Sequence, residues 1–233
     1  MATQATREFT SGPLYRVATA VYGVLGPTAG FLVACFPFAI ALIASKSPVV
    51  WAVGGIVVGP AWAALLYATR VLRAEPDRGA FRTFWRGYRL NAAQGFLVWV
   101  PYWALFCIAA ADVVTPAASP VFLRVVIAIV AAVSMLWMSA VLLVISRYAF
   151  RTRDVLRLGL YVMTAAPRST VTNAALLLVA GGVIYLTSEF VLALLAGVFA
   201  LFAIGAAKGA FELLDARFTA SASSLSESSE AHD

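Results

Sequence analysis

Residues 121–145 read VFLRVVIAIVAAVSMLWMSAVLLVI, and this stretch decides the fold. Its only charged residue is Arg124, near the beginning. A helix needs about 20 consecutive apolar residues to cross roughly 30 Å of lipid hydrocarbon, so the stretch is long enough to span a membrane. We therefore predict a transmembrane α-helix from Val121 to Ile145.

The rest of the chain has the same apolar character. Of its 233 residues, 62% are hydrophobic and only 12% are charged, which is about half the charged fraction of an average soluble domain. The mean hydropathy is +0.90. A soluble domain of this size needs more polar surface to stay in water, so the composition predicts that lipid covers much of the surface. Short gaps between the apolar segments indicate one membrane domain.

Four apolar segments and one longer apolar region are predicted to cross the membrane. They are residues 18–44, 49–72, 92–114, 121–145 and 171–207. At about 1.5 Å per residue the last region is too long for one span. It is expected to break at Thr187-Ser188-Glu189, with Gly181-Gly182 as the alternative. This pattern predicts an all-α fold, a polytopic transmembrane helical bundle of about six helices.

The predicted organisation has three parts. Residues 1–16 form a cytoplasmic N-terminal segment, residues 17–218 the membrane-spanning helical domain, and residues 219–233 a disordered cytoplasmic tail. The tail is rich in Ser and poor in apolar residues, and such segments do not bury enough surface to fold. The first apolar segment exceeds the roughly 7–15 apolar residues of a signal peptide, so it is interpreted as a span.

The basic residues predict the orientation. The net charge is +6, but the Lys and Arg residues lie between apolar segments, where they act as topology determinants rather than as a nucleic-acid surface. With the N-terminus in the cytoplasm, 15 of the 17 basic residues fall on the cytoplasmic side, and only Lys46 and Arg124 fall outside. We therefore expect a multi-pass protein of the bacterial inner (plasma) membrane with both termini cytoplasmic, and with the lipid bilayer but no nucleic acid as a partner.

The most informative stretch for function is residues 78–91, which read RGAFRTFWRGYRLN. At about 100° per residue, its four arginines fall on one arc of a helix and its aromatic residues on an adjacent arc. This pattern is typical of an amphipathic helix that lies in the membrane interface on the cytoplasmic side. The alternative is a docking surface for a cytoplasmic or membrane partner. The candidate partner or lipid contacts are Arg78, Arg82, Arg86, Arg89 and Tyr88.

A second motif, Gly59-Pro60-Ala61, lies in the middle of the second span. Proline removes a backbone hydrogen bond and kinks a helix, whereas small residues let another helix approach closely. The pairs Gly26/Gly30, Gly55/Gly59 and Gly205/Gly209 have the same small-residue spacing. We interpret these positions as helix-packing sites. The alternative is a broken helix that coordinates a substrate.

The run Gly59-Pro-Ala-Trp-Ala-Ala-Leu-Leu-Tyr67, a short basic loop, and the run Phe84-Trp-Arg-Gly-Tyr-Arg-Leu-Asn91 together resemble the signature of the YesL-like family of integral membrane proteins. The resemblance is sharp over residues 59–94, and it departs from the family at Val57-Val58, where many relatives carry Thr or Gly. It assigns motif positions to Gly59, Pro60, Ala61, Tyr67, Phe84, Trp85 and Asn91.

The YesL-like family has no established biochemical activity. Its members are often encoded beside carbohydrate uptake transporters and glycoside hydrolases. The resemblance therefore implies a role in sugar uptake or sensing, with a sugar-uptake transporter or another membrane protein as a partner. This is an inference from association with neighbouring genes, not from a site in the chain.

The sequence contains no recognisable catalytic motif, such as a phosphate-binding loop or a His-Glu-x-x-His zinc signature. We therefore expect no enzyme activity, no cofactor and no metal site. Cys35 and Cys107 lie singly in apolar stretches, which is typical of cysteines that act as small hydrophobes. The favoured function is a non-enzymatic accessory or regulatory membrane protein associated with carbohydrate uptake.

The alternative function is a small membrane transporter or channel subunit. A transport pathway would need polar residues in the middle of the membrane, and the spans offer few: Thr28, Ser134, Ser139 and Asn173. The acidic residues within or beside the spans are Asp112, Asp154 and Glu189. Asp112 and Glu189 are expected near the outer ends of helices, where water reaches them.

Overall fold

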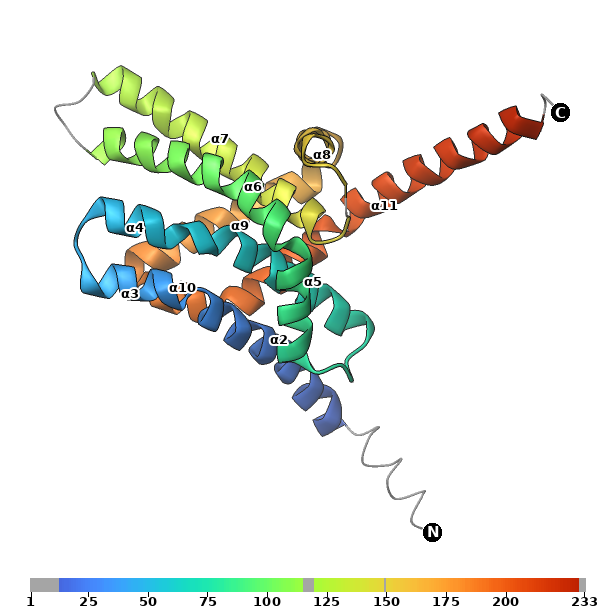
Figure 1. Cartoon of the computed structure of the whole chain (residues 1–233), viewed down its shortest axis with the longest axis horizontal. Helices are drawn as coiled ribbons and strands as arrows, with labels where there is room; N and C mark the ends of the chain where they lie inside the picture. Colours follow the sequence, from blue (N-terminus) through green and yellow to red (C-terminus); the bar gives the residue numbers. More distant parts are fainter. Residues whose placement is uncertain (1–12, 115–119, 149, 231–233) are drawn as a thin grey trace, which may run out of the picture.

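The computed structural model describes residues 13–114, 120–148 and 150–230, and every element in that part of the chain is a helix. The protein is an all-α helical bundle (Figure 1). Its elements are α2 (Pro13–Ala34), α3 (Phe36–Ala44), α4 (Pro48–Gly54), the 3-10 turn η1 (Gly55–Val57), α5 (Val58–Ala74), α6 (Ala80–Val114), α7 (Val121–Ile145), α8 (Thr152–Ala165), α9 (Pro167–Leu186), α10 (Glu189–Leu194) and α11 (Ala196–Glu230).

Five helical stretches in the described part are long and apolar enough to cross a membrane, and a sixth is a bent pair. The protein is thus a membrane protein by the length and composition of its helices. The predicted span at 121–145 coincides with α7, and the second and third spans lie within α4–η1–α5 and α6. The last apolar region breaks between α9 and α10 as predicted, while Gly181 and Gly182 lie inside α9.

The first span differs from the single helix that the sequence predicts. It is divided at Cys35 into α2 and α3, which meet at 54°. Pro37 is the second residue of α3, and it has no backbone N–H to donate to the preceding turn of α2. The proline therefore ends the hydrogen-bond ladder of one helix and begins the next.

The break before α10 has a local cause as well. Ser188 is the residue that precedes α10, and its hydroxyl accepts a hydrogen bond from the backbone N–H of Val191. Ser favours this position because its oxygen satisfies one of the unpaired N–H groups of a helix start. The polar pair Thr187-Ser188 therefore ends α9 and caps α10.

The helices run between two ends of the bundle. We call "the basic end" the one where α5 and α7 finish and where α6 and α9 begin. It lies toward the right of Figure 1, while the α3–α4 turn lies at the other end, on the left. The arginines from Arg70 to Arg89 and from Arg147 to Arg168 all lie on the segments that meet at the basic end.

Helix α5 lies at the centre of the bundle. It packs against α2, α6, α7 and α11, and Leu65 and Leu66 on it are fully buried. The outer surfaces are apolar instead, with Phe122 80% exposed, Leu178 78% and Tyr185 89%. Water disfavours exposed apolar surface of this extent, whereas lipid accommodates it.

The amphipathic stretch predicted at residues 78–91 is not a separate interfacial element. From Ala80 onward it is the beginning of α6, which continues without interruption to Val114. The reason is that Leu90-Asn91-Ala92-Ala93 contains no helix breaker where the boundary was expected. The helix has 35 residues and is longer than one membrane crossing requires, so its first turns extend beyond the span.

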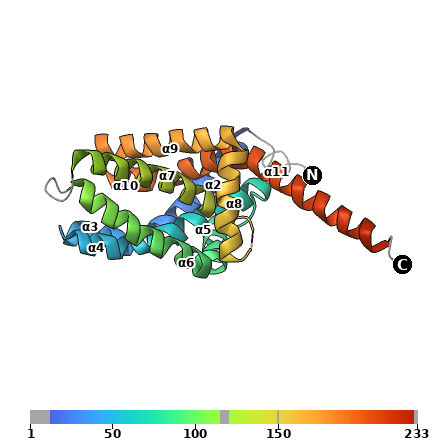
Figure 2. The same ribbon diagram turned by 90° about the horizontal axis from the view of Figure 1, so that it is seen from above.

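A helix that the sequence analysis did not predict, α8, lies between α7 and α9. Figure 2 shows it running across the direction of its neighbours. Val155, Gly159 and Val162 form its buried face, and Gly159 meets Val141 on α7 so closely that a Cβ atom there would collide. The basic segment between the fourth and fifth predicted spans is therefore largely a packed helix.

The chain ends differ from the predicted domain boundaries. Helix α11 continues to Glu230 and projects away from the bundle (Figure 1), past the boundary predicted at residue 219. Residues 1–12 of the predicted N-terminal segment and residues 231–233 of the predicted tail lie outside the described residues. The disorder of the tail and the cytoplasmic location of both ends stay predictions.

Candidate functional site

Three of the predicted contact residues form one surface at the start of α6. Arg82, Arg86 and Arg89 are exposed, and with Trp85 and Leu90 they line an open hollow of about 560 Å³. We call these five residues "the basic surface". Their side chains follow one another at helical spacing, so a single helix presents three guanidinium groups beside an indole and an apolar side chain.

The opposite face of the same turns anchors α6 to the bundle. Phe84 is fully buried, and its ring fills the space beside Gly30 of α2, while Ala80 fills the space beside Gly26. The two glycines are thus packing positions, as the sequence predicted, because any side chain on them would collide with α6. This contact holds the basic surface in place. Gly205 and Gly209 of α11 are not packing positions of this kind, because a Cβ atom added at either meets nothing within 4 Å among the described residues.

The aromatic residues of this stretch largely pack within the protein rather than forming an exposed face. Phe84 lies edge-on to Trp85, with ring centroids 5.7 Å apart, and Trp85 lies edge-on to Tyr88 at 5.5 Å. Trp85 and Tyr88 both pack against the buried core. Of these aromatic residues only Phe81 is exposed, so the stretch offers less aromatic surface to the headgroups than the amphipathic pattern indicates, and its location in the membrane interface stays a prediction.

Arg78 and Tyr88, the other two predicted contacts, lie apart from the hollow. Arg78 forms an ion pair with Glu75 at 2.5 Å in the turn between α5 and α6. Tyr88 is partly buried against the core. The structure therefore brings together Arg82, Arg86 and Arg89, but not the whole predicted set.

The motif residues of the second span pack against α6. Trp99 lies against Gly59, Gly95 against Pro60, and Tyr67 against Gly87. These contacts run along the whole α5–α6 interface, and Ala61 is fully buried. The helix-packing interpretation of Gly59-Pro60-Ala61 agrees with these contacts.

The irregular turn lies just before Pro60 rather than at it. Residues 55–57 form η1, and two indoles bind its neighbouring carbonyls: Trp103 Nε1 donates to Ala52 O at 2.7 Å and Trp99 Nε1 donates to Gly55 O at 3.0 Å. Backbone groups released by a helix break in a membrane need such partners. The indoles of α6 therefore bind carbonyl groups at the break, so these groups do not face lipid unpaired.

Two polar side chains of α6, Gln94 and Asn91, differ in how they are paired. Gln94 donates a hydrogen bond to the carbonyl oxygen of Phe150 at 2.8 Å. Asn91 lies one turn earlier, and its buried Nδ2 has no hydrogen-bond partner among the described residues. Buried polar groups are nearly always paired in proteins, so Asn91 is an unusual residue of the predicted motif.

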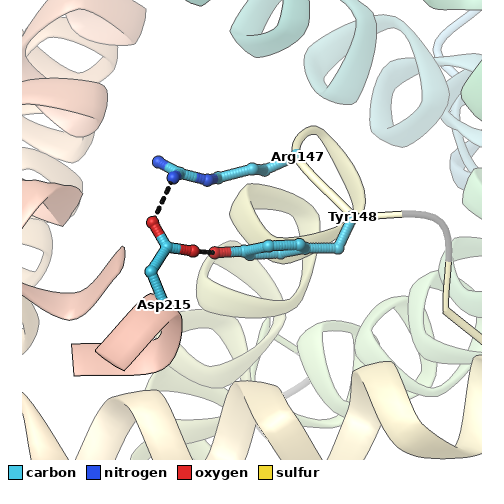
Figure 3. A network of polar contacts seen from close by, with 3 residues as sticks. All are labelled: Arg147, Tyr148 and Asp215. Atoms are coloured by element: carbon cyan, nitrogen blue, oxygen red, sulfur yellow. Dashed lines mark hydrogen bonds and ion pairs between the residues drawn. The ribbon is translucent and has the colours of Figure 1, made fainter. Parts of the chain in front are cut away.

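A polar cluster that the sequence analysis missed joins α7 to α11 at the basic end. Arg147 Nη2 donates to Asp215 Oδ2 at 2.5 Å, and the hydroxyl of Tyr148 donates to Asp215 Oδ1 at 2.6 Å, as Figure 3 shows. The guanidinium of Arg147 also lies over the ring of Phe211, 4.7 Å from its centroid. One carboxylate of α11 thus holds two consecutive residues of the turn after α7.

Arg70, near the end of α5, supports the same turn. Its Nη2 donates to the carbonyl oxygen of Ser146 at 3.1 Å, and its guanidinium lies 5.6 Å from the ring centroid of Tyr67. A cation beside the carbonyl end of a helix is favourable because the helix dipole is negative there. Tyr67, a motif residue, therefore contacts both Gly87 of α6 and Arg70.

The environment of Tyr148 suppresses its ionisation. Burial, together with the hydrogen bond to the Asp215 carboxylate, raises the pKa of Tyr148 to about 12. The phenol therefore stays protonated near neutral pH and acts as a hydrogen-bond donor. The described residues include no group of three or more His, Cys, Asp or Glu side chains that could hold a metal ion, and both cysteines are free thiols.

The comparison with known families extends over the α4–α6 region. Residues 48–113 match the model of a family described as "Protein of unknown function, DUF624". The match contains the motif residues and the basic surface, and it supports assignment of this region to an uncharacterised family. No curated protein and no solved structure matches the chain.

Proposed function

We propose that this protein is a non-enzymatic integral membrane protein that serves as an accessory or regulatory component in carbohydrate uptake. In this proposal the basic surface of α6 binds a sugar-uptake transporter at the cytoplasmic side of the bacterial plasma membrane. The resemblance to the YesL-like family supplies the link to carbohydrates. The geometry of α6 supplies the docking surface.

The observation that carries the proposal is the division of α6 into two faces. Phe84 is 0% exposed and fixes one face against α2, while Arg82, Arg86 and Arg89 are exposed on the other. Arg and aromatic residues are the types most enriched at the centres of protein interfaces. A rigid helix with exposed arginines and an adjacent indole therefore suits a specific partner.

The surface also carries more charge than membrane orientation requires. The other segments at the basic end already carry Arg73, Arg151, Arg153, Arg157 and Arg168, and basic residues in short loops are sufficient to orient spans. The two helices α5 and α6 insert regardless of any lipid anchor. We infer that the additional arginines of α6 bind a partner.

The polar residues of the spans favour this role over transport. The hydroxyls of Thr28, Ser134 and Ser139 donate to carbonyl oxygens of their own helices, and the side-chain amide of Asn173 donates to Ser139. These polar groups therefore form hydrogen bonds within the bundle. Neighbouring the Asn173 pair is a cavity of about 10 Å³, which is room for about one water molecule.

The experiment compares wild-type protein with the triple variant Arg82→Gln, Arg86→Gln, Arg89→Gln. Both are expressed at matched levels, purified from native membranes with a mild detergent, and their partners identified by mass spectrometry. We expect the wild type to retain a subunit of a carbohydrate-uptake transporter and the variant to lose it, with slower growth on complex sugars.

The matched control removes the same charge elsewhere at the basic end. Arg153, Arg157 and Arg168 are exposed, and their triple replacement by Gln should leave the transporter bound. The proposal is overturned if no transporter subunit is recovered with the wild type, or if the α6 variant retains it as well as the wild type does.

A further inference from the structure

Helix α8 has the shape and composition of a helix that lies in the plane of a membrane. Figure 2 shows it crossing the direction of the spans. Its buried face consists of Val155, Gly159 and Val162, while Arg153 and Arg157 are exposed. Helices with one apolar face and one basic face bind at the boundary between lipid headgroups and acyl chains.

The contacts of α8 define its depth along α7. Val141 meets Gly159, and Trp137 Nε1 donates to the carbonyl oxygen of Leu156 at 3.2 Å. Trp137 and Val141 lie about one to two turns before Ile145, where α7 ends. A span of about 20 residues that begins after Arg124 reaches the far edge of the hydrocarbon near Val144. Helix α8 therefore lies at that edge, beside the last turns of α7.

Two aromatic residues belong to the helices of this contact, Trp137 on α7 and Tyr161 on α8 itself. Trp137 and Tyr161 are partly buried against the core, and each has a polar atom on a large ring. Trp and Tyr concentrate at the interface between membrane and water because their rings are apolar at one end and polar at the other. The residue types at this contact are therefore those typical of a membrane interface.

The exposed side of α8 combines charge with an apolar residue. Arg153, Arg157, Leu160 and Thr164 follow one another along one stripe of the helix, and Leu160 is 56% exposed. Long arginine side chains reach the phosphate level while their stems lie along apolar surface. An aqueous helix would not gain from an exposed Leu beside two arginines, whereas a lipid surface accommodates both.

We propose that α8 is an in-plane helix of the headgroup layer, and that Arg153 and Arg157 bind the phosphate groups of anionic lipids while Leu160 inserts among the acyl chains. The partner is a negatively charged phospholipid surface. This site is separate from the basic surface of α6 and from the protein partner proposed for it. It assigns the two groups of exposed arginines at the basic end to different partners.

The first test measures lipid preference. Full-length protein is reconstituted into vesicles of phosphatidylcholine mixed with phosphatidylglycerol, and the selectivity for spin-labelled phosphatidylglycerol over spin-labelled phosphatidylcholine is measured. A basic group near an anionic surface contributes enough for roughly a fivefold preference. We expect Arg153→Gln with Arg157→Gln to lose most of the preference, while Arg82→Gln with Arg86→Gln retains it.

Equal losses in the two double variants would overturn the proposal, since they would indicate diffuse attraction to the whole basic end. The same conclusion would follow from an unchanged preference in the α8 variant. Circular dichroism and gel filtration in detergent identify any variant that fails to fold. In that case Arg153→Lys with Arg157→Lys, which preserves charge, is expected to restore the preference if phosphate binding causes it.

The second test measures depth and does not depend on removing a charge. A nitroxide is attached at Leu160→Cys, or at Asp77→Cys as an aqueous control, in protein whose two native cysteines are replaced by Ala. We expect the label at position 160 to collide more with oxygen than with a water-soluble nickel complex, and the label at position 77 to do the reverse. A label at position 160 that is as accessible to nickel as the control would overturn the proposal.

Discussion

Arg147 and Asp215 lie 68 residues apart in the sequence and form an ion pair in which Nη2 and Oδ2 are 2.5 Å apart. The pair connects the turn after α7 to α11, as Figure 3 shows, and Figure 1 shows α11 projecting away from the bundle toward its C-terminal end. Tyr148 shares the same carboxylate. One acidic side chain therefore joins α11 to the turn after α7, in addition to the apolar contacts that pack this helix against α2, α5 and α9.

We expect Asp215→Asn to lower stability modestly, because both partners are partly exposed, Arg147 by 29% and Asp215 by 47% of their side-chain surface. Exposed ion pairs contribute about 1 kcal/mol or less, which corresponds to a melting temperature lower by about 2–4 °C. Thermal unfolding in detergent measures this change in melting temperature. A double-mutant cycle with Arg147→Gln should give a coupling energy of about 0.5–1 kcal/mol, and zero coupling would mean that the pair contributes nothing.

The pKa of Tyr148, about 12, predicts a loss of stability at high pH. An unperturbed tyrosine has a pKa of about 10, so folding favours the protonated phenol. The stabilisation is fully present below about pH 10 and is lost as the pH rises from about 10 toward 12. The unfolding temperature of wild type minus that of Tyr148→Phe should fall over this range.

A spectroscopic titration tests the cause of the same shift. The difference in phenolate absorbance between wild type and Tyr148→Phe should show a midpoint near pH 12. Because the Asp215 carboxylate contributes to the raised pKa, Asp215→Asn should move that midpoint to lower pH. An unchanged midpoint in Asp215→Asn would show that burial alone causes the shift.

Gly59→Ala should destabilise the bundle, because the added Cβ would collide with the indole of Trp99. Overpacking of this kind costs about 1–3 kcal/mol. Gly181→Ala is the matched control, since a Cβ atom there meets nothing within 4 Å, and replacing Gly by Ala in an open helix position is favourable by up to about 1 kcal/mol. If the two variants unfold at the same temperature, the α5–α6 contact does not depend on this glycine.

The basic end is predicted to face the cytoplasm. In intact cells, an impermeant thiol reagent should label Lys46→Cys at the opposite end of the bundle and should fail to label Asp77→Cys in the α5–α6 turn, in protein without native cysteines. Both positions are exposed, so access to the reagent depends on the side of the membrane. Efficient labelling of Asp77→Cys alone would reverse the orientation.

The spans were predictable because their signal lies in composition. A helix surrounded by lipid needs no polar face, so α7 is recognised from its apolar residues alone. The break between α9 and α10 was predictable from the polar Thr187-Ser188-Glu189, since the chain there carries its own capping residue. The bend at Cys35 has a signal too, because Pro37 lies two residues later, but the apolar run conceals it.

The features of the basic end were harder to predict. Helix α8 was missed because it is too short and too charged to resemble a span, although Val155, Gly159 and Val162 recur at helical spacing. Asp215 was missed because the last span was expected to end at Ala207. The periodic apolar residues Ala207, Ala210, Phe211 and Leu214, all buried, extend the packed part of α11 to the residue before it.

The contacts between residues of different helices could not be predicted from the sequence. No local pattern indicates that Asp215 meets Arg147, or that Phe84 fills the space beside Gly30, because such pairs depend on how whole helices pack. The amphipathic pattern of residues 78–91 gave the arginine face correctly. It placed the aromatic face in lipid because, in sequence, an interfacial helix and the start of a packed helix have the same periodicity.

The most direct test of the proposed function is site-specific photocrosslinking in living cells. A photoreactive phenylalanine analogue replaces Arg86 on the basic surface or, as a control, Tyr185, which is 89% exposed on α9 near the opposite end. We expect one protein adduct from position 86, containing a carbohydrate-uptake transporter subunit, and no such adduct from position 185. The proposed function is wrong if position 86 gives no protein adduct, or if both positions give the same adducts.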